Sequence, residues 1–425
     1  MSKTIIIIGA GLAGLSAALQ AAENGCNVKL VSSLPSERAQ SVMAEGGINA
    51  ALNTKDENDS PEEHFTDTIK AACGLADPNA VWGMTQAAPE LVHWLLKLGV
   101  KFNMSGYDDV DLRNFGGQKK KRTAFAQSDT GKQIMTAMID AVRRKEASGL
   151  VERFSHHSFL TLRLCGNICC GCVIRDEYSQ ETVELPGDAV IVATGGMHGL
   201  FGNTTGSLSN TGEVTAELFR LGVPLANGEM IQYHPTTVKC GGKRMLISEA
   251  ARGEGGRLFA MKDGKQWYFM EEKYPELGNL MPRDITAREI WKVSHESEVF
   301  LDMTEISEKI ISNKLSGLAD DCMTYLHKDI RKEPVSVLPG IHYFMGGILV
   351  DEQHRTPIQN LYAAGECCAQ YHGANRLGGN SLLGALYGGR VAAKSAREQA
   401  DVVDLSCATQ IDFPPTSQIS EIKQL

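Results

Sequence analysis

The sequence predicts an α/β protein built on a parallel, nucleotide-binding sheet, and two stretches carry this prediction. The β-branched run 4–8 leads into a glycine turn at 9–14, a helical pattern over 15–24 and a second strand over 27–32. Strand, glycine turn, helix and strand within about thirty residues form the context in which a GxGxxG turn indicates dinucleotide binding. Much later, the apolar strand 188–193 ends in Ala-Thr-Gly-Gly. This ending suggests a second backbone approach to a nucleotide, with a tight turn after a core strand as the alternative.

The first glycine turn assigns a separate task to each of its glycines. Gly9 makes the tight turn, Gly11 lets the backbone approach a pyrophosphate, and Gly14 lets the helix pack on the strand. The second strand ends in Ser32 and Ser33 rather than in the acidic residue usual for an NAD ribose contact. The sequence therefore favours a flavin nucleotide, or an unusual ribose contact, over NAD bound in the usual way.

Composition places the chain among ordinary globular proteins of two or three domains, with 425 residues of which 43% are hydrophobic and 22% charged. A formal net charge of −9 argues against nucleic acid as a main partner. No apolar run approaches the roughly 18 residues of a membrane span, and the chain opens directly on a strand pattern without a signal peptide. The eleven cysteines are unevenly spaced, which predicts reduced thiols and a cytoplasmic location.

The middle of the chain offers weaker signals. The paired glycines Gly46 and Gly47 suggest a backbone lying flat against a ligand, with a plain loop as the alternative. Phe115, before two further glycines, suggests a ligand wall, whereas the basic run 119–122 is typical of a solvated loop. Cysteines at 165, 169, 170 and 172 lack the second pair that a zinc site needs. They are expected to pack a β-hairpin that turns at Gly166-Asn167, and no metal is predicted.

From about residue 230 the sequence pattern changes to longer polar segments, expected to be loops, that carry histidines and arginines. This pattern continues to the linker 332–334. Near the end, the segment 372–383 combines a histidine, an arginine, two asparagines and three glycines before a helical pattern over 382–393. Arginine offers a planar fork that matches a carboxylate or phosphate, which suggests an anion site, with a glycine-rich turn before a core helix as the alternative. The expected organisation is one nucleotide domain in two parts, 1–230 and 345–400, interrupted by a substrate domain at 231–344 and followed by a tail at 401–425.

Taken in order, these motifs resemble the flavoprotein subunit of succinate dehydrogenase and fumarate reductase, in a family that also includes L-aspartate oxidase. The resemblance covers residues 3–400 and rests on the segments 9–14, 45–48, 115–117, 193–196, 232–236, 252–256, 283–284, 342–343 and 372–382. It implies a Rossmann-like FAD-binding domain interrupted by an α+β capping domain. It also implies hydride transfer between flavin N5 and a C4 dicarboxylate such as fumarate or succinate.

The resemblance also implies roles for individual residues. Arg283 would donate a proton to the substrate, supplied by a relay with Glu249 and Arg252, and the dicarboxylate would be held by His234, Ser248, His342 and Arg376 beside Phe115. The residues expected to bind FAD are Gly9, Ala10, Gly11, Leu12, Ala13, Gly14, Ser32, Ser33, Arg38, Ser41, Gly46, Gly47, Ala193, Thr194, Gly195, Glu213, Glu366, Ser381 and Leu382.

Two departures from the family pattern qualify these expectations. Gln40 stands where the respiratory members carry the histidine that links FAD covalently, so noncovalent FAD is expected. The helical C-terminal domain of the family is expected to be absent, which puts docking to an iron–sulfur subunit, and peripheral membrane association through such partners, in doubt. An L-aspartate oxidase that makes iminoaspartate, and a flavin-binding protein without dicarboxylate turnover, stay open as alternatives.

Overall fold

The computed structural model describes residues 2–106 and 109–400, so the predicted tail at 401–425 lies outside the described residues. Its central element is a parallel five-stranded sheet in the order β20-β10-β1-β2-β6. The α/β class predicted from the sequence is confirmed. The strands are β1 (Thr4–Ile8), β2 (Asn27–Ser32), β6 (Val151–Ser155), β10 (Ala189–Val192) and β20 (Leu361–Ala363).

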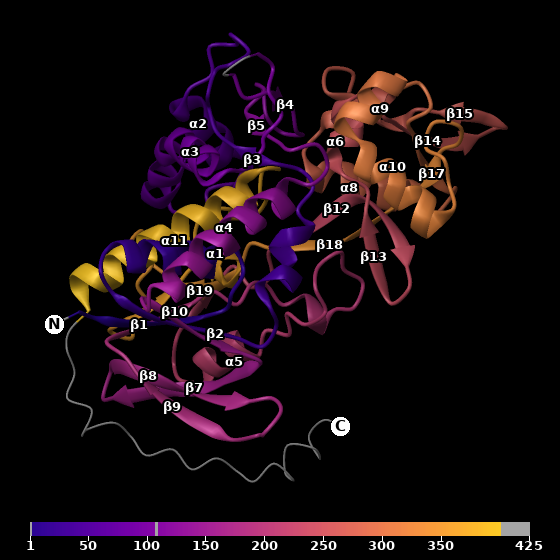
Figure 1. Ribbon diagram of the computed structural model, residues 1–425. Helices are drawn as coiled ribbons and strands as arrows, with labels where there is room; N and C mark the ends of the chain where they lie inside the picture. The colour runs from indigo at the N-terminus through magenta and orange to yellow at the C-terminus, as the bar shows by residue number, and fades with distance from the viewer. Residues whose placement is uncertain (1, 107–108, 401–425) are drawn as a thin grey trace.

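Two different layers cover the two faces of this sheet (Figure 1). Successive side chains of a strand point to opposite faces, so Ile5 and Ile7 join the core with the helices, whereas Ile6 and Ile8 join the core with the hairpin layer. Burial on both faces explains why β1 is a continuous β-branched run. The helices are α1 (Leu12–Glu23), α4 (Thr130–Ala147) and α11 (Asn380–Gln399), and the opposite layer contains β7 (His157–Cys165), β8 (Ile168–Asp176) and β9 (Thr182–Pro186).

The predicted cysteine-rich hairpin is present, because β7 pairs antiparallel with β8 across Gly166-Asn167. Cys169 and Cys172 are fully buried in the core between this layer and the sheet, and burial raises the pKa of Cys169 to about 12. Nine cysteines of the described chain carry free thiols.

Residues between β12 and β18 build a second body with its own hydrophobic core, drawn in orange in Figure 1. Two antiparallel sheets form it, in the orders β13-β12-β18 and β15-β14-β16-β17. The strands are β12 (Ile231–Cys240), β13 (Lys243–Leu246), β14 (Arg257–Lys262), β15 (Lys265–Trp267), β16 (Val299–Asp302), β17 (Val335–Ser336) and β18 (Leu338–Phe344). The helices are α6 (Glu249–Gly253), α7 (Phe269–Lys273), α8 (Arg283–Val293), α9 (Glu308–Lys314) and α10 (Ser316–Asp321).

The remaining elements complete the first body. Helix α3 begins where the Asp77 carboxylate accepts hydrogen bonds from Asn79 N at 2.8 Å and Ala80 N at 3.2 Å, and it ends at Gly99 in the left-handed conformation. No helix in the described ranges is long and apolar enough to cross a membrane. The remaining elements of the first body are α2 (Pro61–Ala71), α3 (Pro78–Leu98), α5 (Glu213–Arg220), β3 (Ile48–Asn49), β4 (Leu112–Arg113), β5 (Thr123–Ala124), β11 (Leu225–Ala226), β19 (Gly347–Leu349) and β21 (Cys368–Ala369).

The basic run 119–122 is a solvated loop only in part. Lys120 donates from Nζ to the carbonyls of Glu57 and Asn58 at 2.7 and 2.9 Å near the surface. Arg122 instead is fully buried and forms ion pairs with Asp59 and Asp67, each at 2.8 Å. A buried guanidinium needs such partners to offset its desolvation. The expectation of a solvated loop is therefore wrong for Arg122.

Candidate active site

A cavity of about 660 Å³ runs from the glycine turn after β1 to the second body. Its wall combines the predicted cofactor and substrate residues, although they come from distant parts of the chain. The predicted residues that line it are Gly9, Ala10, Gly11, Leu12, Ala13, Ser32, Ser33, Arg38, Ser41, Gly46, Gly47, Phe115, Ala193, Thr194, Gly195, Glu213, His234, Ser248, Glu249, Arg283, His342, Glu366, Arg376, Ser381 and Leu382.

Two predicted residues do not line the cavity. Gly14 lies against the carbonyl of Gly9, where an added Cβ would come within 1.8 Å of the oxygen, so it serves close packing of helix on strand. Arg252 lies behind Glu249, with NH1 donating to the carbonyl of Asn279 at 2.6 Å. Any contribution of Arg252 to chemistry must therefore pass through Glu249.

The sheet end of the cavity has the features that a dinucleotide cofactor needs. Gly9 adopts φ +111° and approaches the Ala193 carbonyl so closely that a Cβ would lie 2.3 Å from its oxygen, which brings the two predicted nucleotide loops together. The hydroxyl of Ser32, at the end of β2, is buried without a hydrogen-bond partner among the described residues. A buried hydroxyl is costly unless it is bonded. The residues present therefore fit FAD, with Ser32 free to bond a ribose.

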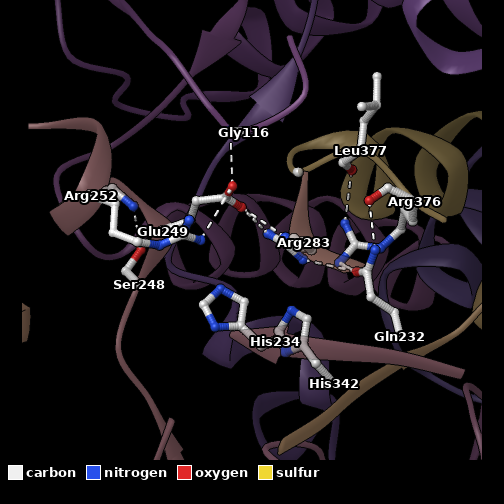
Figure 2. A network of polar contacts seen from close by, with 12 residues as sticks. Gly116, Gln232, His234, Ser248, Glu249, Arg252, Arg283, His342, Arg376 and Leu377 are labelled. Carbon is white, nitrogen blue, oxygen red and sulfur yellow. Dashed lines mark hydrogen bonds and ion pairs between the residues drawn. The ribbon is translucent and has the colours of Figure 1, made fainter. Parts of the chain in front are cut away.

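Arg283 is the centre of the polar network at the other end of the cavity (Figure 2). It is the first residue of α8 and is buried. Its guanidinium lies between two partners, with Nε donating to Glu249 Oε2 at 2.8 Å and NH1 donating to Gln232 Oε1 at 3.0 Å. The NH2 nitrogen lies 2.6 Å from the same Glu249 oxygen. Arg283 is therefore fixed on one side by an ion pair in which two of its nitrogens contact the same carboxylate oxygen, and on the other side by a neutral amide.

The Glu249 carboxylate contacts hydrogen-bond donors from both bodies of the structure. Its Oε1 accepts a hydrogen bond from Gly116 N at 2.9 Å and lies 3.5 Å from Arg252 NH2. Burial alone would raise the pKa of Glu249, but the charges of Arg283 and Arg252 and the hydrogen bonds hold it below its usual value. Glu249 is therefore ionised at neutral pH.

Arg376 approaches the network from the loop before α11, and its hydrogen bonds go to neutral oxygens. NH2 donates to Gln232 Oε1 at 3.0 Å and NH1 donates to the Leu377 carbonyl at 3.1 Å. The guanidinium stacks on the Tyr343 ring at 4.4 Å, and Nε is buried without a partner in the described chain. Burial and the charge of Arg283 lower the pKa of Arg376. This side chain is poised to accept an anionic partner.

His234 and His342 face the network from the sheet of the second body (Figure 2). Their rings lie 5.0 Å apart, and His342 Nδ1 lies 2.8 Å from the Thr205 hydroxyl. Burial, followed by the charge of Arg283, lowers the pKa of both rings well below the usual value. Both histidines are therefore neutral at pH 7 and can hydrogen-bond an anion without carrying a charge of their own.

Phe115 and Ser248 have structural duties besides the predicted substrate contact. The Phe115 ring is buried in the core of the second body, although the residue belongs to the first. Its edge also lies so close to Gly46 that a Cβ there would approach within 2.9 Å. The Ser248 hydroxyl caps α6 by accepting from Ala250 N at 3.4 Å. Each therefore shapes the cavity wall while it fixes an element.

Sequence reasoning missed Gln232, which bridges the two arginines, and Tyr343, which supports Arg376. The signal for Gln232 was strand periodicity, because residues two apart share a face of a strand and His234 was already a candidate. Gln232 also donates from Nε2 to the Arg376 carbonyl at 2.7 Å. Tyr343 carried no such signal, because its stacking partner lies in a different element.

Gln40 lies at the cavity wall, and both ends of its side-chain amide contact polar groups of the protein. Its Nε2 lies 3.0 Å from His198 Nε2, and its Oε1 accepts from Ser207 N at 3.0 Å and from Asn210 Nδ2 at 3.2 Å. His198 in turn lies 3.0 Å from Glu366 Oε1. A side-chain amide is not a nucleophile, so Gln40 offers none to a cofactor.

Comparison with known proteins places the chain among flavoproteins. Residues 4–382 match the family model of an FAD binding domain. The chain is 45% identical to the succinate dehydrogenase flavoprotein subunit of Bacillus subtilis, over 93% of this chain and 69% of that protein. It is 35% identical to an L-aspartate oxidase of Streptomyces coelicolor, over 98% of this chain and 73% of that protein. A variant of E. coli quinol fumarate reductase superposes with a TM-score of 0.89 at 30% identity, covering 100% of this chain and 74% of that one.

Proposed function

The chain belongs to the FAD-binding family of the succinate dehydrogenase and fumarate reductase flavoproteins, and we propose that it interconverts fumarate and succinate. It is an FAD-dependent oxidoreductase by family. The proposal rests above all on the buried cluster of Arg252, Arg283 and Arg376, in which Glu249 forms ion pairs with Arg252 and Arg283.

The charge balance of this cluster selects the substrate class. Three guanidinium groups and one carboxylate leave an excess of positive charge in a buried place, with both nearby histidines neutral. An uncompensated buried charge costs several kcal/mol, which a bound counter-ion offsets. A small dianion such as a C4 dicarboxylate supplies that compensation, whereas a neutral substrate such as a sterol would leave Arg376 unpaired.

The residues divide the work in the following way. Arg376, His234, His342 and the Ser248 hydroxyl bind the two carboxylates and draw electron density out of the alkene, a preorganised electrostatic effect. Arg283 donates a proton to one carbon of fumarate from its guanidinium, and FAD, when bound and reduced by the electron donor, would supply the hydride for the other carbon and return to its oxidised form.

Arginine is a weak acid, so the network around Arg283 has to return its proton. Glu249 holds the Arg283 guanidinium by Nε and NH2 and is followed, on the side away from the cavity, by Arg252. This order supports a relay in which Glu249 and Arg252 reprotonate Arg283 from solvent.

The proposal extends to how the cofactor is held. Gln40 cannot form the covalent link that the family's histidine forms, so FAD is bound by noncovalent contacts alone. Denaturation should release intact FAD, and the denatured chain should have the mass of the polypeptide. A mass increase equal to one FAD would contradict this. Noncovalent flavin in the family tends toward lower potential, which favours fumarate reduction.

Electron transfer requires a partner. Related proteins are named as subunits of menaquinol- and quinol-linked reductases, so we propose that an iron–sulfur protein or another redox protein exchanges electrons with this chain. Association with a membrane would then be peripheral and would depend on that partner.

The decisive assay tests fumarate against aspartate with the purified, FAD-loaded chain. Reduced viologen with fumarate should be oxidised with saturation kinetics, while aspartate with oxygen should give no peroxide. Peroxide formed from aspartate alone would replace the proposal with an L-aspartate oxidase. Absence of both activities in a protein with stoichiometric FAD would leave a flavin-binding protein without dicarboxylate turnover.

A further inference from the structure

The loop 376–379 carries Arg376 and leads into α11. Hydrogen bonds donated to its backbone carbonyl groups fix its conformation. Asn49 Nδ2 at 2.8 Å and Gln118 Nε2 at 2.7 Å both donate to the Gly378 carbonyl, and Asn49 N donates to the Gly379 carbonyl at 3.2 Å. Because these carbonyls are bonded to Asn49 and Gln118, which do not line the cavity, the orientation of the peptide planes that follow Arg376 is fixed.

Asn380, the first residue of α11, connects this loop to two other elements. It is fully buried. Its Oδ1 accepts from Asn49 Nδ2 at 2.7 Å and from His64 Nε2 at 2.9 Å, while its Nδ2 donates to the Thr68 hydroxyl at 3.0 Å. The side chain of Asn380 therefore ties the start of α11 to β3 and α2.

The geometry of Gly379 shows how tight this junction is. Gly379 adopts φ +86°, and a Cβ at that position would lie 2.1 Å from Asn49 Oδ1. Only glycine combines this left-handed conformation with so close an approach. Directly beyond it, Ser381 and Leu382 line the cavity, and the first-turn amides of a helix have no acceptor within the helix.

The burial of His64 carries a free-energy cost, which a purely structural role would not explain. It is fully buried, and its Nδ1 has no hydrogen-bond partner among the described residues. Burial and the charge of Arg122 lower its pKa to about 3, so the ring is neutral and donates from Nε2. The Arg122 ion pairs with Asp67 in α2 and with Asp59 just before it hold this helix, and with it His64, against the segment that precedes β5.

We propose that Asn380, His64 and Asn49 are positioning residues of the active site. They orient the loop 376–379 and the first turn of α11 so that Arg376 faces the dicarboxylate while Ser381 and Leu382 face the cofactor. The proposal rests on the function proposed above. It makes α2, which lies at the edge of the first body (Figure 1), part of the substrate-binding geometry.

The test compares three variants by steady-state kinetics with fumarate, per bound FAD. His64→Leu removes the donor to Asn380 Oδ1 at similar volume, and Asn49→Asp removes the donors to Gly378 and Asn380 without changing size. Both should raise KM for fumarate on the order of 10- to 100-fold, with a smaller change in kcat, because small displacements of a binding group have effects of this size. His64→Gln, which can still donate to Asn380, should restore KM to within about threefold of wild type.

His354→Leu is the matched control. His354 is also fully buried and also packs on α11, but beside Gly388, and its Nδ1 lies 2.6 Å from the Ala363 carbonyl. This variant should lower the melting temperature and leave KM unchanged. Wild-type KM in both His64→Leu and Asn49→Asp, or the same KM change in His354→Leu, would overturn the positioning role. If His64→Leu does not fold, the KM values of Asn49→Asp and His64→Gln decide whether the positioning role holds. Wild-type protein that fails to reduce fumarate would refute the proposed function instead.

Discussion

Arg283 and Arg376 share one acceptor, Gln232 Oε1, at the same distance of 3.0 Å, yet their surroundings differ in charge. Arg283 has a buried carboxylate on its other side, with Glu249 Oε2 2.6 Å from NH2. Arg376 has a tyrosine ring, a backbone carbonyl and an unpartnered Nε.

This difference separates two tasks that a sequence motif cannot separate. A guanidinium already paired with a carboxylate gains little from a second anion, so Arg283 is suited to proton transfer. A guanidinium without a carboxylate gains a full counter-ion when a dianion binds, so Arg376 is suited to hold substrate. The variants below test that division, from the largest expected effect to the smallest.

Arg283→Ala should have the largest effect on turnover. Loss of the proton donor should lower kcat by roughly 10²- to 10⁴-fold, the usual contribution of a general acid. FAD content per chain should stay at the wild-type value, measured by absorbance after denaturation. Loss of FAD with retention of kcat per bound flavin would make Arg283 a structural residue.

Arg376→Lys should act mainly on substrate binding. A lysine cannot reproduce the planar fork that matches a carboxylate, so KM for fumarate should rise on the order of 100-fold with a smaller fall in kcat. Arg390→Lys, on helix α11 that follows the Arg376 loop, is the matched control: Arg390 lies over the Trp94 ring at 4.6 Å, and this variant should keep wild-type KM. A fall in kcat alone would assign the proton-transfer role to Arg376.

Gln232→Leu should affect both arginines moderately. The two hydrogen bonds to Oε1 disappear, and kcat/KM should fall about tenfold, since hydrogen bonds to charged groups contribute about 1.5–3 kcal/mol. In a double-mutant cycle with Arg376→Lys, the combined loss should be smaller than the sum of the single losses. Strict additivity would show that Gln232 does not couple to Arg376.

Glu249→Gln should change stability in a pH-dependent way. The pKa of Glu249 is lowered in the folded protein, so its ion pair stabilises fully above the unfolded value of about 4.5 and is lost as pH falls through the lower, folded value. Thermal unfolding should therefore show a lower Tm for the variant at pH 7 and a difference that narrows below pH 4.5. A difference independent of pH would show that the ionised carboxylate does not provide the stability.

Local sequence patterns predicted much of the first body. The run 4–8, the glycine turn and the strand 27–32 predicted the first βαβ unit to the residue at both strands. The helix was expected from residue 15 and begins at Leu12, because a glycine turn that presents backbone amides passes directly into a helix N-terminus. Residue types in a glycine-rich loop marked Arg376 as a candidate for anion binding, whereas the role of Arg283 came only from the family resemblance.

Only the tertiary structure decided how these residues act on one another. Asn49 reaches Gly378 across 329 positions of sequence, and Phe115 leaves its own body to join the core of the other. The charge balance around Arg283 likewise depends on Glu249, 34 positions away and on a different helix. Local patterns report what a residue can bind, whereas the contacts of a buried charge depend on long-range packing. The sequence therefore determined the chemistry available, and the fold determined which arginine keeps a carboxylate and which one has none.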